Sequence, residues 1–263
     1  MKKKSIILTI ILSFYLMSNS FGQDTLKATF RNCLTELNVN LFQGQLSLNN
    51  ALNQVKFRYM YSPSAALRIG FIVNSKKVVN ASDQVYGTYP TKSNETGTSS
   101  MIGINFGLEK HFSGTKRLSP YIGGEITVGY KWSKYVDEST SNTNTGTNTI
   151  TTTTNGAWPE SQTVQLSNGS NYIYSAYTGE RGFVSYGLNF ITGFDFYMAK
   201  HLFIGYEVEF GFTNKKYSTV DVTSIQTNAS TNNSNSDPYP NIDNKEFSFG
   251  PSIINGIRIG YVF

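Results

Sequence analysis

Ile257-Arg258-Ile259-Gly260-Tyr261-Val262-Phe263 is the last stretch of the chain, and it alternates apolar residues with small or polar ones. Successive side chains of a β-strand point to opposite faces, so one face of this stretch is apolar while Arg258 and Gly260 lie on the other. In a transmembrane barrel the apolar face meets lipid and the polar face lines the lumen. The pattern therefore predicts a strand that closes an outer-membrane barrel.

The beginning of the chain has the pattern of a bacterial signal peptide. Lysines at positions 2–4 precede an apolar run over residues 6–17, and small residues follow at Ser20 and Gly22. The alternative is a retained membrane anchor, but about 12 apolar residues are fewer than the ~20 that a spanning helix needs. We expect a signal peptide over residues 1–22, a periplasmic segment over residues 23–36 and an outer-membrane β-barrel over residues 37–263.

Charge balance and cysteine count argue against nucleic-acid binders and disulfide-stabilised domains. The formal net charge is +5, but removal of three lysines with the signal peptide lowers Lys plus Arg from 22 to 19, against 17 Asp plus Glu. Nucleic-acid binders carry a larger, clustered positive charge. Cys33 is the only cysteine, so we expect an unpaired thiol without a catalytic role, with an intermolecular disulfide as the alternative.

Eight stretches of the chain alternate with period 2, and each is near the roughly 9 to 11 residues with which a tilted strand crosses a bilayer. Over residues 202–212, for example, Tyr206 and Phe210 alternate with Glu207 and Glu209. No later segment approaches about 18 uninterrupted apolar residues, so we expect the mature chain to enter a membrane as strands. The predicted fold is all-β, an eight-stranded antiparallel transmembrane β-barrel, with strands over residues 36–46, 52–61, 65–74, 99–112, 120–134, 182–197, 202–212 and 247–263.

The predicted connections alternate in length, with one exception over residues 47–51. An even strand number puts both termini on one side, so we expect short periplasmic turns and long extracellular loops. A soluble β-sandwich is the alternative, but it leaves this asymmetry and the terminal Phe263 without a cause. The short connections cover residues 62–64, 113–119 and 198–201, and the long ones cover residues 75–98, 135–181 and 213–246.

The long connections are rich in Thr, Asn and Ser, above all over residues 139–155 and 227–236. Such tracts bury little apolar surface, so we expect solvated, mobile loops. The alternative is an adhesive or receptor-like surface, although no loop carries a motif that names a ligand.

The lumen-facing positions of the predicted strands collect cations and anions in equal number. The interior of an eight-stranded barrel is only wide enough for side chains to fill, and an unpaired charge there would be costly. We therefore expect an ion-paired network that plugs the lumen; the alternative is a narrow conducting path lined by the same residues. We expect Glu207 and Glu209 to pair with Arg258 rather than to form a cation site. The predicted lumen network is Lys56, Arg58, Arg68, Glu109, Glu125, Lys131, Asp195, Glu207, Glu209 and Arg258.

The sequence offers little for catalysis. It has two histidines, His111 and His201, both beside short turns, and we expect the pairs Glu109 with His111 and Lys200 with His201 at a wet periplasmic rim. It contains no phosphate-binding loop, zinc-ligand spacing or dinucleotide fingerprint. We expect no catalytic residue, no cofactor and no metal site.

Residues 107–125, Gly-Leu-Glu-Lys-His-Phe-Ser-Gly-Thr-Lys-Arg-Leu-Ser-Pro-Tyr-Ile-Gly-Gly-Glu, resemble the fourth strand, tight turn and fifth strand of small outer-membrane β-barrels. With the signal peptide and terminal Phe, the chain resembles the family related to the OmpA transmembrane domain, particularly the porin-like members common in Bacteroidetes. The C-terminal peptidoglycan-binding domain of full-length OmpA is not expected here. The resemblance implies a Gram-negative outer-membrane location, and recognition of Ile259, Tyr261 and Phe263 by the barrel-assembly machinery.

The leading functional hypothesis is a non-enzymatic integral outer-membrane protein with a plugged polar lumen and a structural or surface-interaction role. Its expected partners are outer-membrane lipid, the assembly machinery and a surface ligand or small solute, but no nucleic acid. The alternative is a narrow channel for small solutes or ions across the outer membrane. An enzyme ranks third, because it would need a convergent polar cluster at the extracellular rim and the sequence shows none.

Overall fold

The computed structural model describes residues 27–38, 54–84, 91–144, 146–165, 171–228, 232–238, 244–252 and 257–263. The predicted signal peptide and the connection over residues 47–51 lie outside them, as does most of the first predicted strand. Every regular element in this part of the chain is a β-strand. No helix here has the length and apolar character of a membrane span.

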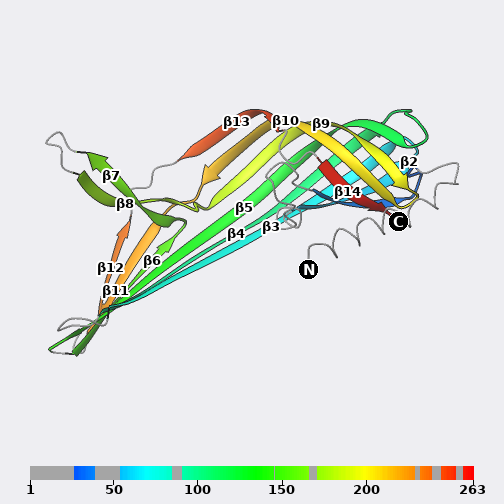
Figure 1. Ribbon diagram of the computed structural model, residues 1–263. Coiled ribbons are helices and arrows are strands. Elements are labelled where there is room, and N and C mark those ends of the chain that lie inside the picture. Colours follow the sequence, from blue (N-terminus) through cyan, green and yellow to red (C-terminus); the bar gives the residue numbers. More distant parts are fainter. Residues whose placement is uncertain are drawn as a thin grey trace, which may run out of the picture.

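Eight strands form an antiparallel sheet whose hydrogen bonds close into a ring (Figure 1). Each strand pairs with the next along the ring, and the last pairs with the first, with Leu34 opposite Val262 and Asn38 opposite Arg258. The predicted all-β antiparallel fold is confirmed. The strand ring consists of β1 (Cys33–Asn38), β2 (Gln54–Ser62), β3 (Ala65–Gln84), β4 (Thr91–His111), β5 (Leu118–Thr143), β9 (Phe183–Ala199), β10 (Leu202–Tyr217) and β14 (Ile257–Val262).

The first and last predicted strands differ from the strands of the structure. β1 begins at Cys33 rather than at residue 36, because Leu34 and Glu36 already alternate inward along it; the Cys33 side chain is exposed. The eighth predicted strand is divided into β13 (Lys245–Ser252) and β14, and both pair with β10.

Three short connections lie at one end of the strand ring, over residues 63–64, 112–117 and 200–201. At this end, the residue after β14 is hydrogen-bonded to the first residue of β1, from Phe263 N to Cys33 O at 2.8 Å. β14 is also bonded to the turn between β9 and β10, from Val262 N to His201 O at 2.9 Å. This end of the interior is filled by a small apolar core. Its members are Ala28, Leu34, Met60, Ala66, Tyr197, Phe203 and Val262.

A projecting sheet extends β3, β4 and β5 beyond the strand ring and runs to the lower left in Figure 1. β6 (Gly146–Asn155) pairs with β5, β11 (Asp221–Thr227) with β6, and β12 (Asn232–Pro238) with β11. The prediction that residues 75–98, 135–181 and 213–246 are loops is therefore wrong for much of their length.

The Thr-rich tract over residues 139–155 forms the hairpin between β5 and β6, and much of the tract over residues 227–236 lies in β11 and β12. Threonine favours strands because its β-branched side chain fits a pleated surface. Cross-strand hydroxyl pairs support the hairpin, with 3.3 Å between Oγ1 of Thr140 and Oγ1 of Thr149. These tracts thus form strands despite their low apolar content.

A separate hairpin of β7 (Trp158–Gln165) and β8 (Asn171–Gly179) lies beside the projecting sheet (Figure 1). Its anchor is the indole of Trp158, whose Nε1 donates a hydrogen bond to the Thr98 carbonyl at 3.2 Å. Gly97 makes room for the indole, because a Cβ there would lie 2.8 Å from the ring. The hairpin is thus attached to β4 by one aromatic side chain.

The seam between β10 and β14 requires a glycine. A Cβ added to Gly260 would collide with the ring of Phe203, which is fully buried. We expect Gly260→Ala to lower the free energy of unfolding by about 1 to 3 kcal/mol, because overpacking displaces side chains and backbone. Urea unfolding of the refolded protein, followed by circular dichroism, measures the change.

The control is Gly124→Ala on the exposed face of β5, where the nearest atom to the new Cβ would be 3.7 Å away. This variant should unfold at the wild-type urea concentration. Equal stability of the two variants would contradict the assignment of Gly260 to a tightly packed seam.

Candidate functional site

The interior of the strand ring contains charged side chains at the inward positions of its strands. Along β4, for example, Asn105 and Glu109 are buried while Phe106 and Leu108 are about half exposed. The charged side chains inside the ring, called here the ion layer, are each at most 4 % exposed. Its members are Glu36, Lys56, Arg58, Arg68, Glu109, Glu125, Asp195, Glu207 and Arg258.

Arg58 connects three other strands across the interior. Its guanidinium lies 2.8 Å from Asp195 Oδ2 on β9, 2.9 Å from Glu36 Oε2 on β1 and 3.3 Å from Glu109 Oε2 on β4. Charge-assisted hydrogen bonds of this kind are stronger than neutral ones. Arg58 therefore holds β2 to β4 and β9, which are not its neighbours in the sheet, and also to its neighbour β1.

Arg68 on β3 makes a second set of cross-links. Its guanidinium contacts Glu207 at 2.8 Å, Glu109 at 2.9 Å and Glu125 at 3.0 Å, on β10, β4 and β5 respectively. Glu109 is shared with Arg58, so the two arginines belong to one continuous network.

Arg258 on the closing strand contacts Glu36 at 2.7 Å and Asp195 at 3.2 Å, and Glu207 at the longer distance of 3.5 Å. Its guanidinium also donates to the hydroxyl of Tyr121, which donates to Glu207 at 2.7 Å. The predicted partners of Arg258 were Glu207 and Glu209. The main carboxylates are instead on β1 and β9, because β1 pairs directly with β14 and brings Glu36 to the guanidinium.

Lys56 completes the ion layer on the side of Glu209. Its ammonium lies 2.9 Å from Glu207 and 3.5 Å from Glu209. The Glu209 side chain is 27 % exposed, whereas that of Glu207 is 3 % exposed. Glu209, which was predicted to belong to the network, thus lies at the accessible edge of the ion layer.

Lys131 does not contact the ion layer but belongs to a second cluster. Its ammonium and that of Lys76 each lie 2.6 Å from a carboxylate oxygen of Glu180, in the turn before β9. Burial alone would raise the pKa of Glu180, but the two ammonium groups lower it to about 2. Lys76 also lies over the ring of Trp158, so this cluster connects the β7–β8 hairpin to the ring strands.

His111 was expected at a wet rim, and that prediction is wrong. The side chain is only 6 % exposed, because β4 continues through residue 111 and directs it inward like Glu109. Its Nε2 lies 3.2 Å from Glu109 Oε2, and its Nδ1 lies 3.0 Å from the Ser119 hydroxyl. Lys200 and His201, by contrast, are exposed beside the turn between β9 and β10.

Sequence reasoning missed Glu36 and Tyr121 as members of the network. Glu36 was the first residue of the first predicted strand, and alternation along that strand did not assign its side chain to the inner or the outer face. Tyr121 shares the alternation phase of Glu125, so the period-2 pattern contained the signal for its inward position. Its fully buried hydroxyl now contacts Arg258 and Glu207.

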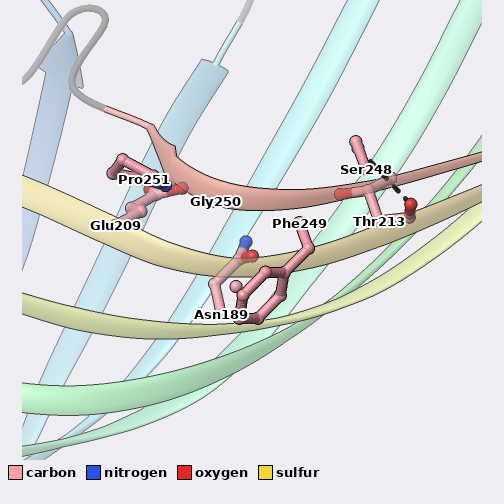
Figure 2. A pocket seen from close by; sticks show the side chains of 8 residues that line it. Asn189, Glu209, Thr213, Ser248, Phe249, Gly250 and Pro251 are labelled. Carbon is pink, nitrogen blue, oxygen red and sulfur yellow. Dashed lines mark hydrogen bonds between the residues drawn. The ribbon is translucent and has the colours of Figure 1, made fainter.

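A chamber of about 340 Å³ opens beside Glu209, on the inner face of β9, β10 and β13 (Figure 2). The inner face is identified by alternation along β10, since Glu209, Gly211 and Thr213 share the phase of the buried Glu207. Gly211 and Thr213 lie opposite Gly250 and Ser248, whereas Phe249 and Pro251 of the lining have the outward phase of β13. The Ser248 hydroxyl donates to the Thr213 carbonyl at 3.4 Å. The lining residues are Asn189, Glu209, Gly211, Thr213, Ser248, Phe249, Gly250 and Pro251.

The interior cross-links the strands of the ring through ion pairs between side chains of different strands. Within the described ranges, no three or more His, Cys, Asp and Glu side chains are arranged to hold a metal ion. The carboxylates of the ion layer accept hydrogen bonds from arginine, lysine, tyrosine or asparagine side chains. Comparison with known proteins yields no match among family models, curated proteins or solved structures.

Removal of Arg58 should be strongly destabilising. We expect Arg58→Met to lower the free energy of unfolding by about 3 to 5 kcal/mol, because it leaves Glu36, Glu109 and Asp195 buried with less compensating charge. The midpoint of urea unfolding measures the loss.

Lys92→Met is the matched control, since Lys92 pairs with Asp83 at 3.4 Å on the exposed part of the projecting sheet. This variant should change stability by no more than about 1 kcal/mol. If Arg58→Met were equally mild, the ion layer would not be the main support of the ring.

Proposed function

We propose that the strand ring is an eight-stranded transmembrane β-barrel of a Gram-negative outer membrane. The observation that carries this proposal is the polarity of the ring, which is charged inside and apolar outside. On β4, the outward side chains of Ile102, Ile104, Phe106 and Leu108 are 50 to 55 % exposed. A contiguous apolar surface of this extent on a protein in water marks an interaction site, and lipid is the partner that surrounds a ring on all sides.

The dimensions of the apolar band support a bilayer. Along β4 and the residue that follows it, the band extends over residues 102–112. About ten residues rising about 3.3 Å each, tilted by about 40°, span about 25 Å. This is the height of the lipid-facing band in such barrels. Tyr130 and Trp132 stack at the edge of the band next to the projecting sheet, with ring centroids 5.7 Å apart. Tyr261 and Phe263 lie at the opposite edge, where the short turns are. Aromatic side chains at both edges are typical of membrane interfaces.

We further propose a non-enzymatic role in which the ion layer plugs the lumen and the projecting sheet provides the extracellular surface. Paired side chains occupy the interior of the ring, in keeping with the narrow bore of an eight-stranded barrel. In this arrangement the short connections face the periplasm. The signal peptide directs export, and Ile259, Tyr261 and Phe263 serve as the assembly signal.

A matched pair of arginine substitutions tests membrane insertion. Ile126 on the ring and Ile225 on the projecting sheet are 56 % and 45 % exposed. We expect Ile126→Arg to cost about 2 to 4 kcal/mol in lipid vesicles, because it puts a charge near the bilayer midplane, while Ile225→Arg leaves stability unchanged. Urea unfolding in vesicles measures both, and an equally small effect in both variants would indicate that the ring is not surrounded by lipid.

Single-channel recording tests the plug. The refolded protein, shown by heat-modifiable gel mobility to be folded, should be silent in a planar bilayer, because the ion layer closes the lumen. Reproducible openings altered by Glu207→Gln would instead support the alternative, a narrow channel for small solutes or ions.

A further inference from the structure

We propose that the chamber beside Glu209 binds a small organic cation, of the class of short primary ammonium compounds. This role goes beyond the proposed scaffold and requires no conducting path. Three features of the interior carry it: an imbalance of charge, the position of Glu209 and the shape of the chamber.

The interior has more carboxylates than cations. Four cations, Lys56, Arg58, Arg68 and Arg258, face six carboxylates, which are the five of the ion layer and Glu209. Counting His111, which contacts Glu109, as a fifth cation still leaves one carboxylate in excess. The undescribed residues between positions 39 and 256 contain no Lys, Arg or His, so they supply no cation. The six carboxylates are Glu36, Glu109, Glu125, Asp195, Glu207 and Glu209.

Glu209 is where this excess charge is accessible. Lys56 contacts it at 3.5 Å but lies closer to Glu207, at 2.9 Å. Lys215, two positions beyond the chamber residue Thr213 along the same face of β10, is itself paired with Glu246 at 2.8 Å. A ligand ammonium in the chamber would therefore meet a carboxylate that no cation of the protein fully compensates.

The rest of the chamber suits a short organic ammonium compound. Asn189, Thr213 and Ser248 provide an amide and two hydroxyls, and Figure 2 shows Asn189 and Glu209 on neighbouring strands of the wall. Its volume of about 340 Å³ is at the small end of ligand pockets, which measure roughly 300 to 1,000 Å³. A chelated divalent metal would need several carboxylates, and Glu209 is the one carboxylate in the lining.

Calorimetric titration of the refolded full chain in detergent tests the proposal with 1,4-diaminobutane and its neutral isostere 1,4-butanediol. We expect saturable binding of the diamine and at least about tenfold weaker binding of the diol, because only the diamine forms a charge-assisted hydrogen bond to Glu209. Absence of diamine binding to the folded protein, or equal affinity for the diol, would overturn the proposal.

Two variants locate the site. Glu209→Gln should weaken diamine binding at least about tenfold, whereas Glu138→Gln, on the exposed projecting sheet, should leave it unchanged. Asn189→Leu replaces the amide in the chamber wall with an apolar side chain of similar size, without changing charge, and should also weaken diamine binding, so the test remains decisive if Glu209→Gln fails to fold. Unchanged affinity in a folded Glu209→Gln or Asn189→Leu variant would refute this site. The result is independent of whether Ile126→Arg supports membrane insertion.

Discussion

The strand ring depends on ion pairs inside it. Arg58, Arg68 and Arg258 each contact carboxylates from at least two other strands, and Arg258 reaches Glu36 across 222 positions of sequence. Such pairs are favourable only when both charges are satisfied, because desolvation of either alone is costly. The same requirement makes the closed ring and the ion layer interdependent: open strands would separate the partners, and unpaired charges would oppose closure.

Charge inside and apolar surface outside together underlie the proposed transmembrane barrel. The outward side chains need an apolar surrounding, and the inward ones need one another. The ion layer fills the middle of the interior, while the apolar core around Phe203 and Val262 fills the short-turn end. Toward the projecting sheet, the described side chains enclose the chamber beside Glu209. If the proposed function holds, the plugged barrel would still hold the proposed solute site between its plug and the projecting sheet.

The projecting sheet shows where composition misleads. Thr151 to Thr154 were assigned to a mobile loop on their polarity, yet they form the centre of β6 between β5 and β11. Their β-branching was visible in the sequence and favours a strand. The pairing partners were not visible, because β11 lies far from β6 in the chain, and polar strands lack the alternation of hydrophobicity that marks a membrane strand.

For β2, β3, β4, β5, β9, β10 and β14, the sequence by itself determined the inward and outward faces, since period-2 alternation follows from strand geometry and is local to each strand. It thereby placed Arg58, Arg68, Glu109 and Glu207 on the inner face. Tertiary structure alone decided the pairing: Lys131 contacts Glu180 rather than the ion layer, Glu36 enters the network, and His111 is buried. These outcomes depend on strand register and on the height of each residue in the ring, and neither is encoded by the spacing of residues along one strand. The sequence therefore specifies which side chains lie on the same face of a strand. Only the closed ring decides which of the charged side chains contact one another.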